Sequence, residues 1–124
     1  GGSELILMVE DNELVLKLGI TLLNSLGYTV IPAEDGNAAL AILRQRKDID
    51  LLFTDVIMPG MGGHELAEQA LQLYPQLRVL FASGYTQDLM IEERQLTKGV
   101  SLLLKPYNKS ALAVKIRSVL DAEK

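Results

Sequence analysis

Polar side chains that could do chemistry follow four apolar runs of this sequence, at the point where each run ends. In chain order they are Glu10, Asp11, Asp55, Ser83 and Lys105. If the runs are parallel strands, their carboxyl ends meet at one edge of a sheet, where ligands of such sheets bind. Three carboxylates gathered there repel one another, so at least one must be protonated or a cation must bind. The pattern therefore predicts a charged site at this edge.

These residue types suit phosphoryl transfer, which needs chiefly positioning and charge neutralisation. Mg²⁺ takes oxygen ligands from a few carboxylates and retains several waters, a role that suits the adjacent pair Glu10 and Asp11. Lys105 supplies a fixed positive charge, and Ser83 supplies a neutral hydrogen-bond donor. A carboxylate is a competent nucleophile for this reaction. Asp55 is the best candidate for that nucleophile.

Asp55 stands out because of its neighbours along the chain. It closes a run expected to be the central strand, and a loop rich in proline and glycine follows at 59–63. Such a loop leaves the approach to the carboxylate open. An ordinary turn aspartate is the alternative, and the Met-Pro-Gly context argues against it.

The elements that must position these residues alternate along the chain. We expect strands at 5–9, 28–33, 50–54, 77–82 and 100–104. We expect helices after Asn12 up to Gly27, at 35–46, 64–74 and 86–97, and from Asn108 or Ser110 onward. Five alternations predict an α/β sandwich with a parallel sheet and, through right-handed crossovers, helices on both faces.

Apolar residues at helical spacing indicate which side of each helix faces the core. For the first helix they are Leu14, Val15, Leu18, Leu22 and Leu26; for the second, Ala39, Ile42 and Leu43; for the third, Leu66, Ala70 and Leu73; for the last, Leu112, Ile116, Val119 and Leu120.

Composition narrows the class of protein. The 124 residues suit one domain, assigned here to 4–123, and residues 1–3 read as a cloning remnant. An excised domain of a longer protein and a complete small protein remain equal alternatives. The net charge of −4 argues against direct nucleic-acid binding. No apolar run approaches the roughly 20 residues that span a bilayer, and the absence of cysteine fits a reducing compartment. We expect a cytoplasmic domain without membrane contact.

Four short motifs, in matching order and spacing, resemble the receiver domain of bacterial two-component response regulators. They are Val9-Glu10-Asp11-Asn12, the segment Thr54 to Met61, Ser83-Gly84 and Lys105-Pro106. The resemblance covers nearly the whole chain and implies a flavodoxin-like (CheY-like) three-layer sandwich. That fold has a five-stranded parallel sheet in the order 2-1-3-4-5 and five helices.

The resemblance also implies roles. The aspartate at position 55 accepts phosphate from a histidine kinase or a histidine phosphotransfer domain, Lys105 contacts the phosphoryl group, and Ser83 reports phosphorylation. The implied ligands of Mg²⁺, or of Mn²⁺, are Glu10, Asp11, Asp55 and the Ile57 backbone carbonyl. The domain then promotes only its own phosphorylation and dephosphorylation. The Lys105-Pro106 peptide bond is commonly cis in this family. A homodimer is compatible with this class.

Three positions depart from the family pattern. Leu102 replaces the aromatic residue whose rotation accompanies switching in many receivers, so switching is expected through Ser83 and backbone movement. Neither Ile57 nor Tyr85 is an acid or an amide that would orient an attacking water well, which predicts slow loss of phosphate. Segments 80–86 and 104–107 further resemble receivers of hybrid sensor kinases, where the domain would be part of a histidine kinase.

Other functions use similar residues. An aspartyl-phosphate phosphatase of the HAD-like kind needs a second acid near the nucleophile and a cap, whereas position 57 is isoleucine and no insertion is large enough for a cap. A nucleotide- or flavin-binding module needs a glycine-rich loop after the first strand, where Glu10 and Asp11 stand instead. A receiver that serves only as a scaffold remains an alternative.

Overall fold

The computed structural model describes residues 3–83, 100–105 and 107–122. Its strands are β1 (Leu5–Val9), β2 (Thr29–Ala33), β3 (Leu51–Asp55), β4 (Arg78–Ser83) and β5 (Val100–Leu104). Its helices are α1 (Glu13–Ser25), α2 (Gly36–Gln45), α3 (Gly63–Leu73) and α5 (Lys109–Asp121). The strands form one parallel sheet in the order β2-β1-β3-β4-β5, as predicted. The helix expected at 86–97 lies outside the described residues.

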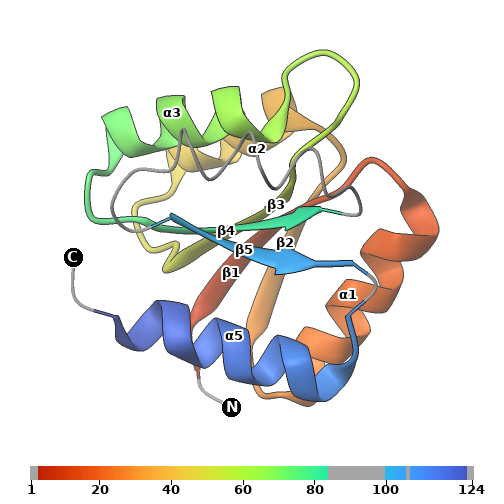
Figure 1. Cartoon of the computed structure of the whole chain (residues 1–124). Coiled ribbons are helices and arrows are strands. Elements are labelled where there is room, and N and C mark those ends of the chain that lie inside the picture. The colour runs from red at the N-terminus through yellow and green to blue at the C-terminus, as the bar shows by residue number, and fades with distance from the viewer. Residues whose placement is uncertain (1–2, 84–99, 106, 123–124) are drawn as a thin grey trace.

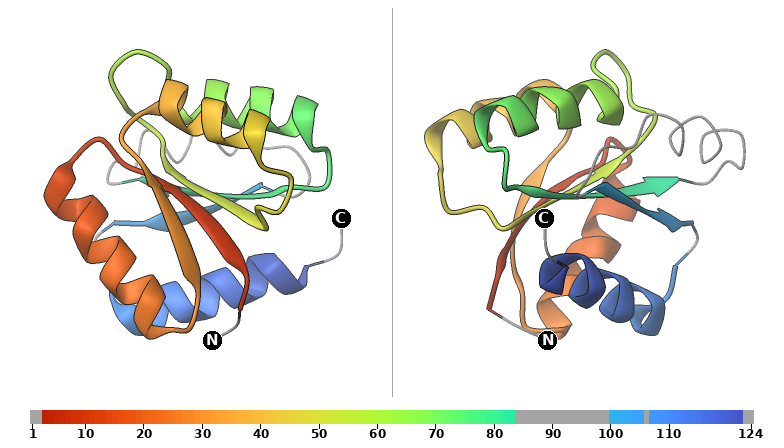
Figure 2. Two further views of the ribbon diagram at one scale, coloured as in Figure 1. Left: turned by 180° about the vertical axis from the view of Figure 1, so that it is seen from behind. Right: turned by 60° about the vertical axis from the view of Figure 1, so that its left-hand side comes forward.

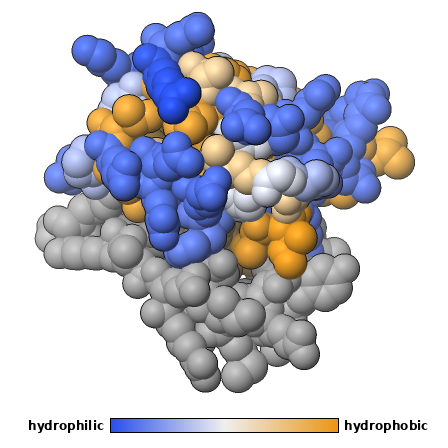
Figure 3. Space-filling view, turned by 90° about the horizontal axis from the view of Figure 1, so that it is seen from above, coloured by the Kyte–Doolittle hydropathy of each residue, from blue (hydrophilic) through white to orange (hydrophobic). Residues whose placement is uncertain are grey.

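The helices cover both faces of the sheet. Helices α2 and α3 lie on one face and α1 and α5 on the other, so that β1 and β3 run between two helical layers (Figures 1 and 2). Seen from the α2–α3 side, the described surface is largely hydrophilic, with apolar side chains showing between the polar ones (Figure 3). None of the helices in the described ranges is long and apolar enough to cross a membrane.

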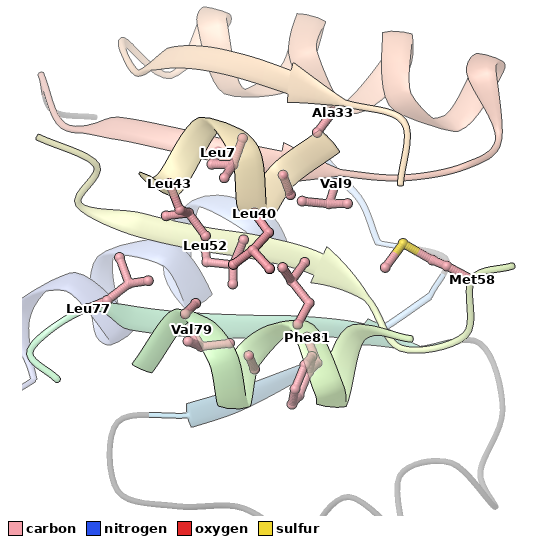
Figure 4. Packing of buried hydrophobic residues seen from close by; sticks show 14 of the residues in the cluster. Leu7, Val9, Ala33, Leu40, Leu43, Leu52, Met58, Leu77, Val79 and Phe81 are labelled. Carbon is pink, nitrogen blue, oxygen red and sulfur yellow. The ribbon is translucent and has the colours of Figure 1, made fainter. Parts of the chain in front are cut away.

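Alternation along the strands builds two apolar cores. In β1, Leu7 and Val9 face α2 and α3, whereas Ile6 and Met8 face α1 and α5. Figure 4 shows the first core, which includes Leu7, Val9, Leu40, Leu43, Leu52, Val79 and Phe81. Burying one such side chain contributes about 1.5–3 kcal/mol. The central strands are thus fixed from both sides, and so are the residues at their carboxyl ends.

Side-chain caps start three of the helices. The carboxamide oxygen of Asn12 accepts from the Val15 N–H at 3.1 Å, and that of Asn108 accepts from the Ala111 N–H at 2.8 Å. Asp35 caps α2 in the same way. Asn108, rather than Ser110, therefore starts the last helix. Its cap fixes where the chain enters α5 after Lys105.

The buried side of α1 differs from the predicted one. Leu14 and Leu18 are 78% and 58% exposed, and the buried residues are Leu16, Gly19 and Leu23. The prediction is wrong for Leu14 and Leu18, whereas Leu22 and Leu26 pack against the core as expected. Apolar residues occur on more than one side of this helix, so several faces fit the same spacing. The face that contains Gly19 is buried because a residue without a side chain lets α1 approach Met8 of the sheet closely.

The inner face of α3 is shifted slightly from its predicted position. Leu66 and Ala70 are buried as expected, and Ala67 joins them. Leu73 is wrongly predicted as a core residue: it is 43% exposed because it is the last residue of the helix, where the chain turns away toward β4.

Candidate functional site

Four of the predicted side chains lie together beyond the carboxyl ends of the strands. Glu10 and Asp11 follow β1, Asp55 is the last residue of β3, and Lys105 follows β5. Strands β1 and β3 are neighbours in the sheet. As a result, one carboxylate oxygen each from Glu10, Asp11 and Asp55 lies within 4.8 Å of the others. The strand-end argument thus identifies a real cluster.

Lys105 bridges two of the three carboxylates. Its Nζ lies 2.9 Å from Oε1 of Glu10 and 3.1 Å from Oδ1 of Asp55. The side chains of Glu10, Asp55 and Lys105 are 4%, 16% and 23% exposed, so the pairs are shielded from bulk water but open on one side. Burial acts to lower the Lys105 pKa, but Glu10 and Asp55 outweigh it and the pKa lies above its ordinary value. The ammonium therefore stays charged at neutral pH.

Backbone groups fix the orientation of the two carboxylates. Oε2 of Glu10 accepts from the Asp11 N–H at 3.0 Å, and Oδ1 of Asp55 accepts from the Val56 N–H at 3.2 Å. Among the described residues, both contacts to the Asp55 carboxylate are made at Oδ1. Its second oxygen, Oδ2, has no hydrogen bond or ion pair to any residue of the described ranges.

The backbone behind Asp55 is held by two residues that the strand-end argument does not find. The hydroxyl of Thr54, which is buried, donates to the Asp55 carbonyl at 3.0 Å. The N–H of Gly63 donates to the Val56 carbonyl at 2.8 Å, which brings the start of α3 against the end of β3. A buried threonine beside the aspartate and a glycine at the expected helix start are the only sequence signals for these contacts.

The acidic side of the cluster opens into a wider pocket. Its lining adds carboxylates from the start of α1 and from the loop after β2 to the pair that follows β1. The lining residues are Glu10, Asp11, Glu13, Leu16, Glu34, Asp35 and Pro59. Asp11 is exposed toward this pocket, so the negative side of the site is accessible from solution.

The remaining predicted residues are placed less completely. Ser83 is the last residue of β4 and pairs with Leu104 of β5, but its side chain lies outside the described part, as do Gly84, Tyr85 and Pro106 with its peptide bond. Ile57 follows Asp55 by two residues, and 58% of it is exposed. Leu102 is partly buried against the α2–α3 core.

Residues 6–117 match the response regulator receiver domain family. The chain belongs to this family. Receiver domains are the phosphoacceptor signalling modules of two-component systems and work with histidine kinases. The family generally binds Mg²⁺ at an acidic pocket, and in this chain Glu10, Asp11 and Asp55 form an acidic cluster.

Two relatives show the settings in which similar receivers occur. The sensor kinase CckA of Brucella abortus is 32% identical over 123 residues, which are 98% of this chain and 13% of CckA. The response regulator receiver protein CpdR of the same organism is 30% identical over 117 residues, 94% of this chain and 97% of CpdR. The receiver thus spans a small part of the kinase and nearly all of CpdR.

Solved structures agree with this fold. The receiver domain of the hybrid histidine kinase CckA is 36% identical, with a TM-score of 0.80, and the match covers 94% of this chain and 99% of that one. A receiver domain protein from Methanospirillum hungatei is 28% identical, with a TM-score of 0.84, and the match covers 97% and 95%. The flavodoxin-like, CheY-like prediction is confirmed, and the phosphatase alternative is not favoured.

Proposed function

We propose that Asp55 of this receiver accepts a phosphoryl group from a phosphohistidine, and that the new charge switches the domain. The observation that supports it is the bridge of Lys105 between Asp55 and Glu10, with Asp11 close by. A fixed cation beside a partly exposed carboxylate stabilises charge that develops on a transferring phosphoryl group. Histidine kinases or histidine phosphotransfer domains are the proposed partners.

The geometry suggests a role in phosphoryl transfer for each of several groups of the chain. Oδ2 of Asp55 forms the new bond to phosphorus while the bond from phosphorus to the imidazole nitrogen breaks, and the departing nitrogen keeps that electron pair. Lys105 is already charged and lies beside Oδ1, so it can move onto a phosphoryl oxygen without any proton transfer. The Val56 N–H and the Thr54 contact hold the nucleophile in place.

The donor set fits Mg²⁺. Three carboxylates whose oxygens lie within 4.8 Å of one another, one of them exposed, match a hard cation that keeps several waters. We propose Glu10, Asp11, Asp55 and the backbone carbonyl of Ile57 as the residues that hold it. Bound there, the cation neutralises charge on the acceptor and on the incoming phosphoryl group.

We further propose how the signal leaves the site. Phosphorylation replaces one negative charge by roughly two and adds acceptor oxygens, which biases any loop that bonds to them better in one state. Leu102 is an apolar residue packed against the α2–α3 core. It has no aromatic ring whose rotation could report phosphorylation. Ser83 and the backbone that follows it are the proposed route.

The setting of the domain is also a proposal. The sensor kinases CckA and RcsC contain segments that match this chain, as does the receiver protein CpdR. We infer that the chain serves as a receiver in the cytoplasm, either within a hybrid sensor kinase or on its own. A homodimer is compatible with both settings.

Incubation with acetyl phosphate and Mg²⁺ tests this function. The wild-type protein should gain one phosphoryl group by intact mass, and peptide mapping should place it on Asp55. Asp55→Asn, which keeps the size but removes the nucleophile, should gain none. Chelation of Mg²⁺ should abolish the gain in the wild type.

Asp50→Asn is a matched control, because this aspartate lies at the opposite end of β3 and accepts a hydrogen bond from the Leu5 N–H. It should be phosphorylated as the wild type is. A wild-type protein that binds Mg²⁺ but gains no phosphoryl group from acetyl phosphate or a phosphohistidine donor would contradict the proposal and support a scaffold.

Ile57 predicts a long-lived phosphoprotein. Its exposed side chain stands two residues after Asp55 and cannot hydrogen-bond to a water that attacks phosphorus. Ile57→Gln adds a group that can do so, and dephosphorylation of the purified phosphoprotein should become about tenfold faster. Ile57→Leu should leave the rate unchanged. Loss of phosphate within seconds in the wild type would refute this prediction.

A further inference from the structure

Tyr107 lies directly behind the site. It follows Lys105 by two residues, is partly buried and packs against the core that faces α1 and α5. The centroid of its ring is 5.9 Å from that of Phe53, at an interplanar angle of 50°. Phe53 is buried in β3, two residues before Asp55. The ring of Tyr107 therefore rests on the strand that carries the phosphoacceptor.

Gly19 makes room for this arrangement from the side of α1. A Cβ added at Gly19 would lie 2.1 Å from the Met8 methyl carbon and 3.6 Å from the Tyr107 hydroxyl oxygen. Met8 in turn precedes Glu10 by two residues. Helix α1 thus reaches both Met8 and Tyr107, and the side chain of Tyr107 lies between α1 and β3.

Tyr107 also borders the charged groups themselves. It lines a small gap together with Glu10, Asp55 and Lys105. Burial raises the pKa of its phenol; Lys105 lowers it, Glu10 and Asp55 raise it, and the net shift is upward. The Tyr107 side chain is therefore uncharged at neutral pH, and it borders the charged cluster on one side.

The position of Lys105 needs such support. It follows β5, an edge strand that pairs only with β4, and its ammonium must reach carboxylates beyond β1 and β3, farther into the sheet. The next fixed point is Asn108, which caps α5. Of the described residues between these points, Tyr107 packs its side chain against the core.

We propose that Tyr107 is a positioning residue for Lys105: its ring, held between Phe53 and α1 at Gly19, fixes the chain so that the ammonium lies between Asp55 and Glu10. The inference rests on the proposed function, in which Lys105 meets the phosphoryl group. Tyr107 touches no reacting atom and acts only through Lys105. The rigid aromatic ring matters more than the hydroxyl.

The rate of phosphorylation by acetyl phosphate tests this role. Tyr107→Leu should lower the initial rate about tenfold because Lys105 is no longer held between Asp55 and Glu10, whereas the dissociation constant of Mg²⁺ should not rise, since a displaced ammonium leaves the carboxylates more negative. Tyr107→Phe, which keeps the ring, should restore the wild-type rate. If Tyr107→Leu does not fold, Tyr107→Met fills the same space with a flexible chain and should show the same loss.

Tyr28 offers a matched control. It is a buried tyrosine of the same core, but it lies just before β2, and its hydroxyl is 3.5 Å from Nη1 of Arg117. Tyr28→Leu should lower the melting temperature and leave the phosphorylation rate of the folded protein unchanged. Equal loss of rate in both leucine variants would assign Tyr107 a merely structural role and overturn the proposal.

A double mutant separates action through Lys105 from an independent effect. In the Lys105→Met background, Tyr107→Leu should cause no further loss of rate, whereas independent effects would multiply. If the wild type is not phosphorylated at all, the proposed function fails. The positioning role of Tyr107 can then still be tested by urea unfolding of the metal-free protein. There the stability change caused by Lys105→Met should be smaller in the Tyr107→Leu background, and strict additivity would overturn the inference.

Discussion

Replacement of Lys105 by methionine should slow phosphorylation of the receiver by about 100-fold while strengthening its binding of Mg²⁺. The ammonium lies 2.9 Å from Glu10 and 3.1 Å from Asp55, so it partly neutralises both carboxylates before any cation arrives. Without it the site is more negative and attracts Mg²⁺ more strongly. The phosphoryl group, however, loses the donor that lies beside the nucleophile. Stopped reactions with acetyl phosphate and calorimetric titration with Mg²⁺ measure the two effects.

The opposite signs of the two effects make the result specific. General damage to the fold would weaken both phosphorylation and metal binding. Lys109→Met is the matched control, because Lys109 is an exposed lysine at the start of α5 and should change neither quantity. Wild-type phosphorylation of Lys105→Met would contradict the role given to the ammonium.

The metal-free protein should also respond to this substitution. In Lys105→Met three carboxylates remain close together without the bridging cation, so the free energy of unfolding should fall in the presence of a chelator. Mg²⁺ binds only the folded site, and at saturating concentration it should restore much of the loss. Urea unfolding with and without Mg²⁺ measures this difference.

The charged cluster could be predicted from the sequence because parallel strands place their carboxyl ends at one edge. The positions of the apolar runs were enough to predict that Glu10, Asp11, Asp55 and Lys105 lie close together. Small errors in the predicted ends of the strands did not change this prediction. Those runs are apolar on both faces, which is typical of buried parallel strands and allows few other assignments. Strand order came from the family resemblance, and the structure confirms it.

The contacts behind the cluster could not be predicted in this way. Close approach between segments that are distant in sequence determines the roles of Gly19, Gly63 and Tyr107. The spacing of apolar residues along the chain does not predict which distant segments approach closely. The same limit explains why Leu14 and Leu18 of α1 are exposed against expectation, because the apolar spacing of this helix fits several sides. Packing, rather than pattern, decides these positions.

The second large effect is expected at Gly63. A Cβ at this position would lie 2.1 Å from the Asp55 carbonyl oxygen and 3.0 Å from the Asp55 carbonyl carbon. Both are backbone atoms, which cannot turn aside as a flexible side chain can. Gly63→Ala must therefore push α3 away from the end of β3, which also weakens the hydrogen bond from the Gly63 N–H to the Val56 carbonyl.

Such a displacement should affect stability and function together. We expect Gly63→Ala to lower the free energy of unfolding by about 1–3 kcal/mol, as overpacking of a close contact does. Because a shift of about 1 Å at a reacting group can reduce a rate about 100-fold, phosphorylation of Asp55 should fall steeply in the fraction that stays folded. Urea unfolding followed by circular dichroism, and phosphorylation kinetics under folding conditions, measure the two losses.

Gly62 provides the control one residue away. A Cβ there would meet the Val56 carbonyl oxygen at 3.4 Å, an ordinary contact, and the backbone, with φ −74° and ψ 168°, is open to any residue. Gly62→Ala should therefore change stability by less than about 1 kcal/mol and leave phosphorylation intact. If Gly63→Ala behaved like Gly62→Ala, the start of α3 could yield without moving the acceptor. Asp55 would then be held by β3, Thr54 and Val56 alone.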